Sequence, residues 1–284
     1  MTTSTLQEAA VARPLPKDAI DEIVRLCADE PESLREPEAL LALRPDLPAV
    51  RSFARTVRER TYGDFGFDVI SSEGLPAAYR RLAYAAIGIE YAEPILRYGL
   101  LYAVADRGES YLEKQIPVSM TRADTGMHTD SSARDCVPGV VALLCERPSL
   151  DGGMSRIASA VQACEWLALH DPKALELLQK TYIRDVVTPG MDKGLDSLKR
   201  NRFPVVSLEP EFQLRYMRYW IEKGQERAGA PLSGDVLAAF DALDAALDRP
   251  EFGVTFRLEA GQMLFVDNRR LVHGRDAYGS VPSG

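Results

Sequence analysis

The order of helix and strand patterns along this chain constrains its fold more than any other feature. Apolar residues spaced three and four apart predict helices from residue 17, over about 47–60, and from 75 to about 98. Short strand patterns dominate after residue 99, and residues 139–145 form a continuous apolar run typical of a strand buried on both faces. A helical first third followed by many short strands indicates an α+β chain.

Two further helical patterns interrupt the strands, at about 160–180 and 219–247. Asp171 and Ser233 are suited to cap two of these helices at their N-termini. Two closing strands follow between residues 254 and 266. Because helices precede and interrupt a set of short strands, we predict a double-stranded β-helix, or jelly-roll, core with flanking and inserted α-helices.

The chain is long enough to bury one full core, and we expect residues 17–284 to form a single domain. Residues 1–16 precede the first helical pattern and are interpreted as a flexible N-terminal arm. The arm lacks both a basic segment and an apolar segment after it, so we expect no signal peptide.

Composition excludes several classes of partner. The net charge of −8 and the pI near 5.1 argue against binding to nucleic acid or to an anionic membrane surface. No apolar run approaches the ~18–20 residues that cross a bilayer. The cysteines lie in apolar segments without CxxC spacing, which indicates reduced, buried thiols of a cytoplasmic protein and neither a disulfide framework nor a zinc site. They are Cys27, Cys136, Cys145 and Cys164. The oligomeric state stays open.

The chain has three histidines, and two of them are placed as an iron enzyme would need them. His128 and Asp130 are two residues apart, a spacing that points both side chains to the same face of a strand. This pattern alone has low specificity, since Asp and Glu make up 42 of 284 residues. His170 reads as an exposed helix-terminal residue, so His273 is the better third ligand. Two histidines and one carboxylate form the facial triad of non-haem Fe(II) enzymes.

Three segments resemble the taurine dioxygenase and clavaminate synthase-like group of Fe(II)/2-oxoglutarate-dependent oxygenases. They are residues 126–130 (GMHTD), 151–158 (DGGMSRIA) and 258–275 (LEAGQMLFVDNRRLVHGR). The third segment is the most specific, because a glycine-turned strand that ends in Asp-Asn-Arg and then His-Gly-Arg rarely arises by chance. The resemblance covers the chain from about residue 60 onward.

The resemblance implies that His128, Asp130 and His273 are iron ligands. Ser155 falls where this group has a hydroxyl residue that helps to hold the co-substrate carboxylate, although a serine after Gly-Gly is also a common turn residue. Halogenating members carry Gly or Ala in place of the carboxylate ligand. Asp130 occupies that position here, which favours hydroxylation.

Two further residues are candidates for contact with substrate. Arg275 either lines the pocket or pairs with an acid on the surface. Gln115 either faces the substrate or is an ordinary buried or solvated glutamine. Asp267 and Asn268 are expected to shape the turn before His273.

The resemblance implies a dioxygenase that uses Fe(II), 2-oxoglutarate and O2. It would hydroxylate a C–H bond of a small molecule, such as an amino acid or a biosynthetic intermediate, and release succinate and CO2. One alternative is a non-catalytic relative that binds a metal or a small acid. Another is a cupin-like metal enzyme that does not use 2-oxoglutarate, against which the Asp-Gly-Gly-x-Ser segment argues.

The pattern departs from the family at its C-terminal end. Members bind the distal carboxylate of 2-oxoglutarate with an arginine on the final barrel strand, about a dozen or slightly more residues beyond the second histidine. The sequence reaches Gly284, eleven residues beyond His273, and residues 279–284 read as a loop. We expect the natural chain to continue into that strand. The alternative is a chain that ends here with an unpaired sheet edge and a weakened co-substrate site.

Overall fold

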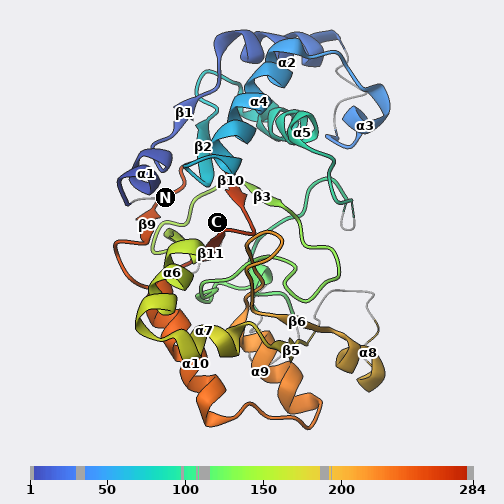
Figure 1. Cartoon of the computed structure of the whole chain (residues 1–284). Coiled ribbons are helices and arrows are strands. Elements are labelled where there is room, and N and C mark those ends of the chain that lie inside the picture. The colour runs from blue at the N-terminus through green and yellow to red at the C-terminus, as the bar shows by residue number, and fades with distance from the viewer. Residues whose placement is uncertain are drawn as a thin grey trace.

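The described part of the chain contains four β-sheets, and the larger two face each other and carry helices on their outer sides (Figure 1). The computed structural model describes residues 3–29, 36–96, 99–106, 108, 116–185, 192 and 194–279. Within these ranges no helix is both long enough and apolar enough to cross a lipid bilayer.

The first sheet has β10 near its centre. Its strand order is β1 (Arg13–Pro14), β2 (Phe67–Ser71), β10 (Gln262–Asp267) and β3 (Val140–Leu144). β10 is antiparallel to both β2 and β3, whereas β1 is parallel to β2. Side chains alternate along β10, with Met263 and Phe265 in the core under the N-terminal helices and Leu264 and Val266 in the core between the sheets.

The second sheet is antiparallel, with strand order β11 (Leu271–Arg275), β4 (Ser155–Ser159) and β9 (Gly253–Phe256). Leu271 and Ile157 face the inner core, and Val272 and Ala158 face the outer helices. His273 pairs with Ile157, so this register places the histidine two residues from Leu271 on the inner face.

Helices from the first third of the chain cover the outer face of the first sheet. They are α2 (Lys17–Asp29), α3 (Ala39–Leu43), α4 (Pro48–Tyr62) and α5 (Arg80–Tyr91). The buried side of α4 is formed by Val50, Phe53, Ala54 and Val57, whose spacing makes one apolar stripe.

A second helical layer covers the other sheet. It consists of α6 (Ala160–His170), α7 (Pro172–Leu178), α9 (Arg218–Arg227) and α10 (Gly234–Leu247). The side chains of Asp171 and Ser233 accept hydrogen bonds from Ala174 N and Val236 N, as expected for N-caps.

The remaining short elements connect these layers. They are β5 (Thr181–Ile183), α8 (Leu195–Arg200), β6 (Arg202–Pro204), β7 (Val206–Ser207), β8 (Gln213–Leu214) and the 3-10 turns Ala77–Tyr79 and Val118–Met120. Residues 100–106, where strand patterns begin in the sequence, contain neither helix nor strand.

The N-terminal segment differs from the flexible arm that the sequence predicts. Residues 3–9 form helix α1 (Thr3–Ala9), and its Leu6 and Ala9 are fully buried in the core between the sheets. Arg13 then pairs with the buried carboxylate of Asp68 on β2. A helix of this length is not stable alone, so its order comes from burial against the sheets.

Candidate metal centre

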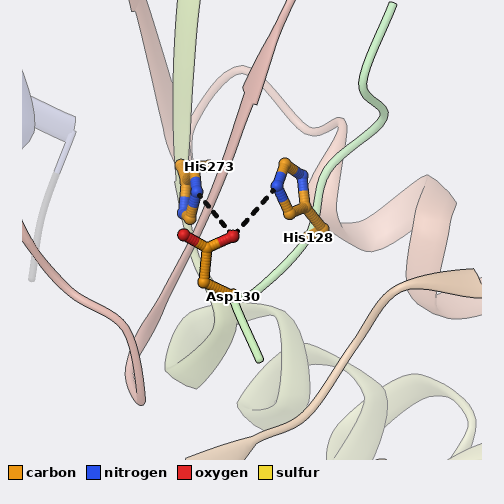
Figure 2. A group of neighbouring side chains, drawn as sticks. All are labelled: His128, Asp130 and His273. Atoms are coloured by element: carbon orange, nitrogen blue, oxygen red, sulfur yellow. Dashed lines mark ion pairs between the residues drawn. The ribbon is translucent and has the colours of Figure 1, made fainter. Parts of the chain in front are cut away.

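Three side chains from two distant segments converge at one point (Figure 2). His128, Asp130 and His273 each offer one donor atom, and these atoms lie within 4.8 Å of one another. Asp130 Oδ1 is 3.6 Å from His128 Nε2 and 3.9 Å from His273 Nε2. The histidine side chains are 16% and 12% exposed, whereas that of Asp130 is 45% exposed. The donor atoms therefore face a partly open position.

Backbone pairing brings the two histidines together. His128 and His273 form an isolated antiparallel bridge in which each N–H donates to the carbonyl of the other, both at 2.9 Å. Residues paired in this way carry their side chains on the same side of the sheet. The imidazole centroids are accordingly 4.5 Å apart.

Thr129, between the two ligand candidates on its segment, is held by a different partner. Its N–H donates to the carbonyl of Tyr216 at 2.8 Å, and its hydroxyl oxygen accepts from Tyr216 N at 2.9 Å. The Tyr216 hydroxyl donates to Asp244 on α10 at 2.6 Å. These contacts tie the ligand segment to the helical layer on the outer side of the second sheet.

The orientation of His128 is set by a hydrogen bond from its other ring nitrogen. Nδ1 donates to the carbonyl of Gly126 at 3.0 Å, so Nε2 keeps its lone pair for the cluster. Gly126 has a φ of +62°, a conformation that favours glycine. His273 Nδ1 is buried without a hydrogen-bond partner among the described residues. The backbone pairing with His128 therefore fixes only the direction of its Cα–Cβ bond.

The cluster is electrostatically suited to a cation. Burial alone would raise the pKa of Asp130, but its hydrogen bond with His128 and the charges of His273 and His128 lower that pKa to about 2. Burial and the charge of His128 lower the pKa of His273 to about 4. For His128 the lowering by burial is outweighed by the hydrogen bond and charge of Asp130, so its pKa is raised. Two imidazole nitrogens beside a carboxylate make a donor set that suits Fe(II) with positions left open.

Ser155 and Arg275 are opposite each other in the second sheet, two residues along from the pair Ile157 and His273. The register therefore puts them on the same face as His273. The Arg275 guanidinium donates from Nη2 to the carbonyls of Thr121 at 2.7 Å and Ala123 at 2.8 Å. Arg275 thus holds the loop that leads into the ligand segment.

Two other residues singled out from the sequence lie elsewhere. His170 is exposed at the end of α6, where its ring stacks on Trp166 with centroids 4.3 Å apart. Gln115 lies outside the described residues.

Gly126 and Tyr216 also contribute to the site, and the sequence predicts the role of neither. A glycine two residues before the histidine is a weak signal for a backbone acceptor. Tyr216 carries no signal, because it meets Thr129 from a segment 87 positions away.

Gly274 supports a prediction about the orientation of His128. A Cβ at this position would lie 2.7 Å from the carbonyl oxygen of Gly126, the acceptor for His128 Nδ1. Gly274→Ala is therefore expected to displace that carbonyl and weaken Co(II) binding about 10-fold, the lower end of the range for loss of an outer-shell partner. Calorimetric titration measures the Co(II) affinity of the variant and of wild type. Gly234→Ala is the matched control, since its Cβ meets nothing within 4 Å. An unchanged affinity in Gly274→Ala would contradict the prediction.

Comparison with known proteins shows which family this chain belongs to. The family model "Taurine catabolism dioxygenase TauD, TfdA family" matches residues 65–283. The chain is similar to gamma-butyrobetaine dioxygenase of Pseudomonas sp. (strain AK-1), at 28% identity over 182 residues that cover 64% of this chain and 45% of that protein. It is also similar to FR-33289 synthase of Streptomyces rubellomurinus (strain ATCC 31215), at 24% identity over 220 residues, 76% of this chain and 62% of that protein. The chain spans about half the length of the gamma-butyrobetaine dioxygenases that it matches.

Solved structures share the fold. An asparagine oxygenase in complex with Fe(II), 2S,3S-3-hydroxyasparagine and succinate superposes with a TM-score of 0.69 at 19% identity, over 96% of this chain and 90% of that chain. The non-heme iron oxygenase OrfP with Fe and alpha-ketoglutaric acid has a TM-score of 0.63 at 15% identity, over 95% and 89%. Because the family model covers most of its length, the chain belongs to the taurine catabolism dioxygenase TauD, TfdA family.

Proposed function

We propose that the protein is a non-haem Fe(II)- and 2-oxoglutarate-dependent dioxygenase that hydroxylates a C–H bond of a small molecule. The observation that carries the proposal is the convergence of His128, Asp130 and His273 within 4.8 Å in a chain of this family. These three side chains would hold Fe(II) from one side. The bound metal, with 2-oxoglutarate and O2, supplies the oxidising chemistry, and succinate and CO2 are released.

The protein's own residues perform the positioning. The paired backbones of His128 and His273 bring the two imidazoles side by side, and the Gly126 carbonyl selects the tautomer of His128. We assign Ser155 to the co-substrate carboxylate, because it lies on the face of His273 next to Arg275. Arg275 would shape the substrate side through the loop at Thr121 and Ala123, and contact between Gln115 and substrate stays a prediction.

The substrate class is inferred from the chemistry named in the relatives. Gamma-butyrobetaine dioxygenase and uridine-5'-phosphate dioxygenase are named for small molecules, and the asparagine oxygenase structure contains a hydroxylated amino acid. An amino acid or a biosynthetic intermediate is therefore the substrate that we propose. The non-catalytic alternative finds no support among these relatives. The net charge of −8 supports a small-molecule partner over nucleic acid.

The fold and compartment complete the proposal. The two facing sheets and their shared inner core support a double-stranded β-helix with helical insertions at about 160–180 and 219–247. The single domain includes residues before 17 as well, because Leu6 and Ala9 lie in the core between the sheets. Cys27 and Cys164 are buried as the sequence predicts, whereas Cys136 is exposed. All four are free thiols, which supports a reducing, cytoplasmic location.

Anaerobic addition of Fe(II) and 2-oxoglutarate tests the proposed function. We expect a weak metal-to-ligand absorption band in the visible, followed by succinate release when O2 and a panel of free amino acids are supplied. Protein without Fe(II) is the control for succinate formed by contaminants. The absence of both the band and any succinate above this control would overturn the proposal.

A further inference from the structure

One buried amide side chain contacts the backbone on both sides of Asp130. Asn268 is fully buried, and its Oδ1 accepts a hydrogen bond from Asp130 N at 2.8 Å. Its Nδ2 donates to the carbonyl of Asp130 at 3.1 Å and to that of Pro138 at 3.1 Å. Both protons of the amide and its oxygen are therefore engaged, and two of the three bonds go to a single residue.

These bonds matter because Asp130 lies outside the regular strands. His273 is on β11, and His128 is paired with it, so both are placed by sheet register. The carboxylate of Asp130 is 45% exposed, and its ion-pair contacts are with the two histidines. The direction of its Cα–Cβ bond consequently depends on the backbone at Asp130, which the Asn268 amide holds at both its N–H and its carbonyl.

The turn that carries Asn268 is itself rigidly attached. Asp267 Oδ1 accepts from the backbone N–H groups of Arg269 at 2.9 Å and Arg270 at 3.2 Å, which closes the turn. The Arg270 guanidinium pairs with Asp267 and also donates to the carbonyls of Thr61 and Gly63 at the end of α4. The backbone that carries the Asn268 amide is therefore held in place by hydrogen bonds.

We propose that Asn268 is a positioning residue that sets the place of the Asp130 carboxylate in the metal centre. The inference rests on the proposed function, since it assumes that Asp130 is a metal ligand. A residue of purely structural value would lower the stability of the fold when replaced, but would leave the metal affinity of the folded protein unchanged. A positioning residue acts on the affinity itself, because loss of an outer-shell partner costs about 10- to 100-fold in metal binding.

The experiment compares wild type, Asn268→Ala and Asn268→Ser with Asn201→Ala as a matched control. Asn201 also donates its amide to a backbone carbonyl, that of Arg184 at 2.7 Å, and none of its described hydrogen bonds involves the three donor residues. Co(II) affinity is measured by calorimetry at a temperature where every variant is folded. Hydrogen–deuterium exchange of the Asp130 amide is measured in the metal-free proteins.

Asn268→Ala is expected to bind Co(II) about 10- to 100-fold more weakly than wild type, and Asn201→Ala to bind it equally well. Asn268→Ser is expected to fall between them, because a hydroxyl can replace one of the three hydrogen bonds. Exchange at the Asp130 amide should accelerate in the Asn268 variants and stay unchanged in the control. If Asn268→Ala fails to fold, the Co(II) affinity and the Asp130 amide exchange of Asn268→Ser test the inference in its place.

Wild-type Co(II) affinity in a folded Asn268 variant would overturn the inference, as would an equal loss in Asn201→Ala. A wild-type protein that binds no Co(II) would instead defeat the proposed function. Exchange at the Asp130 amide distinguishes the two failures. The exchange rate reports whether Asn268 holds the backbone of Asp130 even when no metal binds. An unchanged exchange rate in Asn268→Ala would show that Asn268 does not hold this backbone.

Discussion

Asp130→Ala is expected to weaken Fe(II) and Co(II) binding by more than about 100-fold, beyond the range for loss of an outer-shell partner, and to abolish succinate formation. The carboxylate is the one anionic donor of the cluster, with a pKa lowered to about 2, so it is ionised at neutral pH. Its removal leaves only the two imidazoles of His128 and His273 to hold the ion. Calorimetric titration and the anaerobic absorption band measure the loss.

Thermal unfolding gives an independent readout of the same variant. A metal at 100 times its Kd stabilises the folded state by about 2.7 kcal/mol, so wild type should unfold at a higher temperature with Co(II) than without it. Asp130→Ala should show no such rise at the same Co(II) concentration. The control is Asp248→Ala. Asp248 is an exposed aspartate directly after the C-terminal end of α10, and its carboxylate pairs with Arg156 at 2.5 Å. Retention of wild-type metal binding by Asp130→Ala would show that the ligand assignment is wrong.

Arg184→Met is expected to lower the free energy of unfolding by about 3 kcal/mol or more, because it removes a charged group that donates to several backbone carbonyls. The Arg184 side chain is fully buried, and its guanidinium donates to the carbonyls of Phe203 at 2.6 Å, Pro204 at 3.0 Å and Arg215 at 2.7 Å. Burial and the charge of Arg215 lower the pKa of Arg184 to about 9, so the group is still charged at neutral pH.

Removal of a buried charge offsets part of this loss, but a hydrogen bond from a charged group contributes about 1.5–3 kcal/mol, and at least three such bonds are lost. A loss of 3 kcal/mol corresponds to a fall in Tm of roughly 6–12 °C for a chain of this size. Arg202→Met is the control, since Arg202 is exposed and donates to Thr181 at 3.2 Å. A change in Tm no larger than that of the control would refute the structural role of Arg184.

The elements that could be predicted from the sequence are those whose signals are local. Asp171 and Ser233 cap α7 and α10 because a short polar side chain next to an apolar repeat meets the free N–H groups of the first turn. The strand β10 follows a glycine turn and is apolar from Met263 to Val266, which identifies it without any partner. Helix α1 could not be predicted, since Leu6 and Ala9 make a helical face only where the two sheets leave a place to bury it.

In the candidate site, too, local signals could be predicted from the sequence and contacts between distant segments could not. His128 and Asp130 are neighbours in sequence, and the Asp-Asn-Arg run before His273 marks the second segment. Asn268 belongs to that run, but its contact with Asp130 across 138 positions has no sequence signal. The contact of Tyr216 with Thr129 across 87 positions has none either. Arg275 was a candidate for substrate contact, whereas its guanidinium is directed to the carbonyls of Thr121 and Ala123.

The sequence by itself therefore determined which donors the candidate centre offers: two imidazoles and a carboxylate, on two segments that resemble those of an iron oxygenase. Only the tertiary structure decided how those donors are held. The bridge between His128 and His273 and the amide of Asn268 each require backbone groups from distant segments to lie within hydrogen-bonding distance. Such contacts arise when the sheets pack, because their geometry depends on register and burial and not on the residues beside them in the chain.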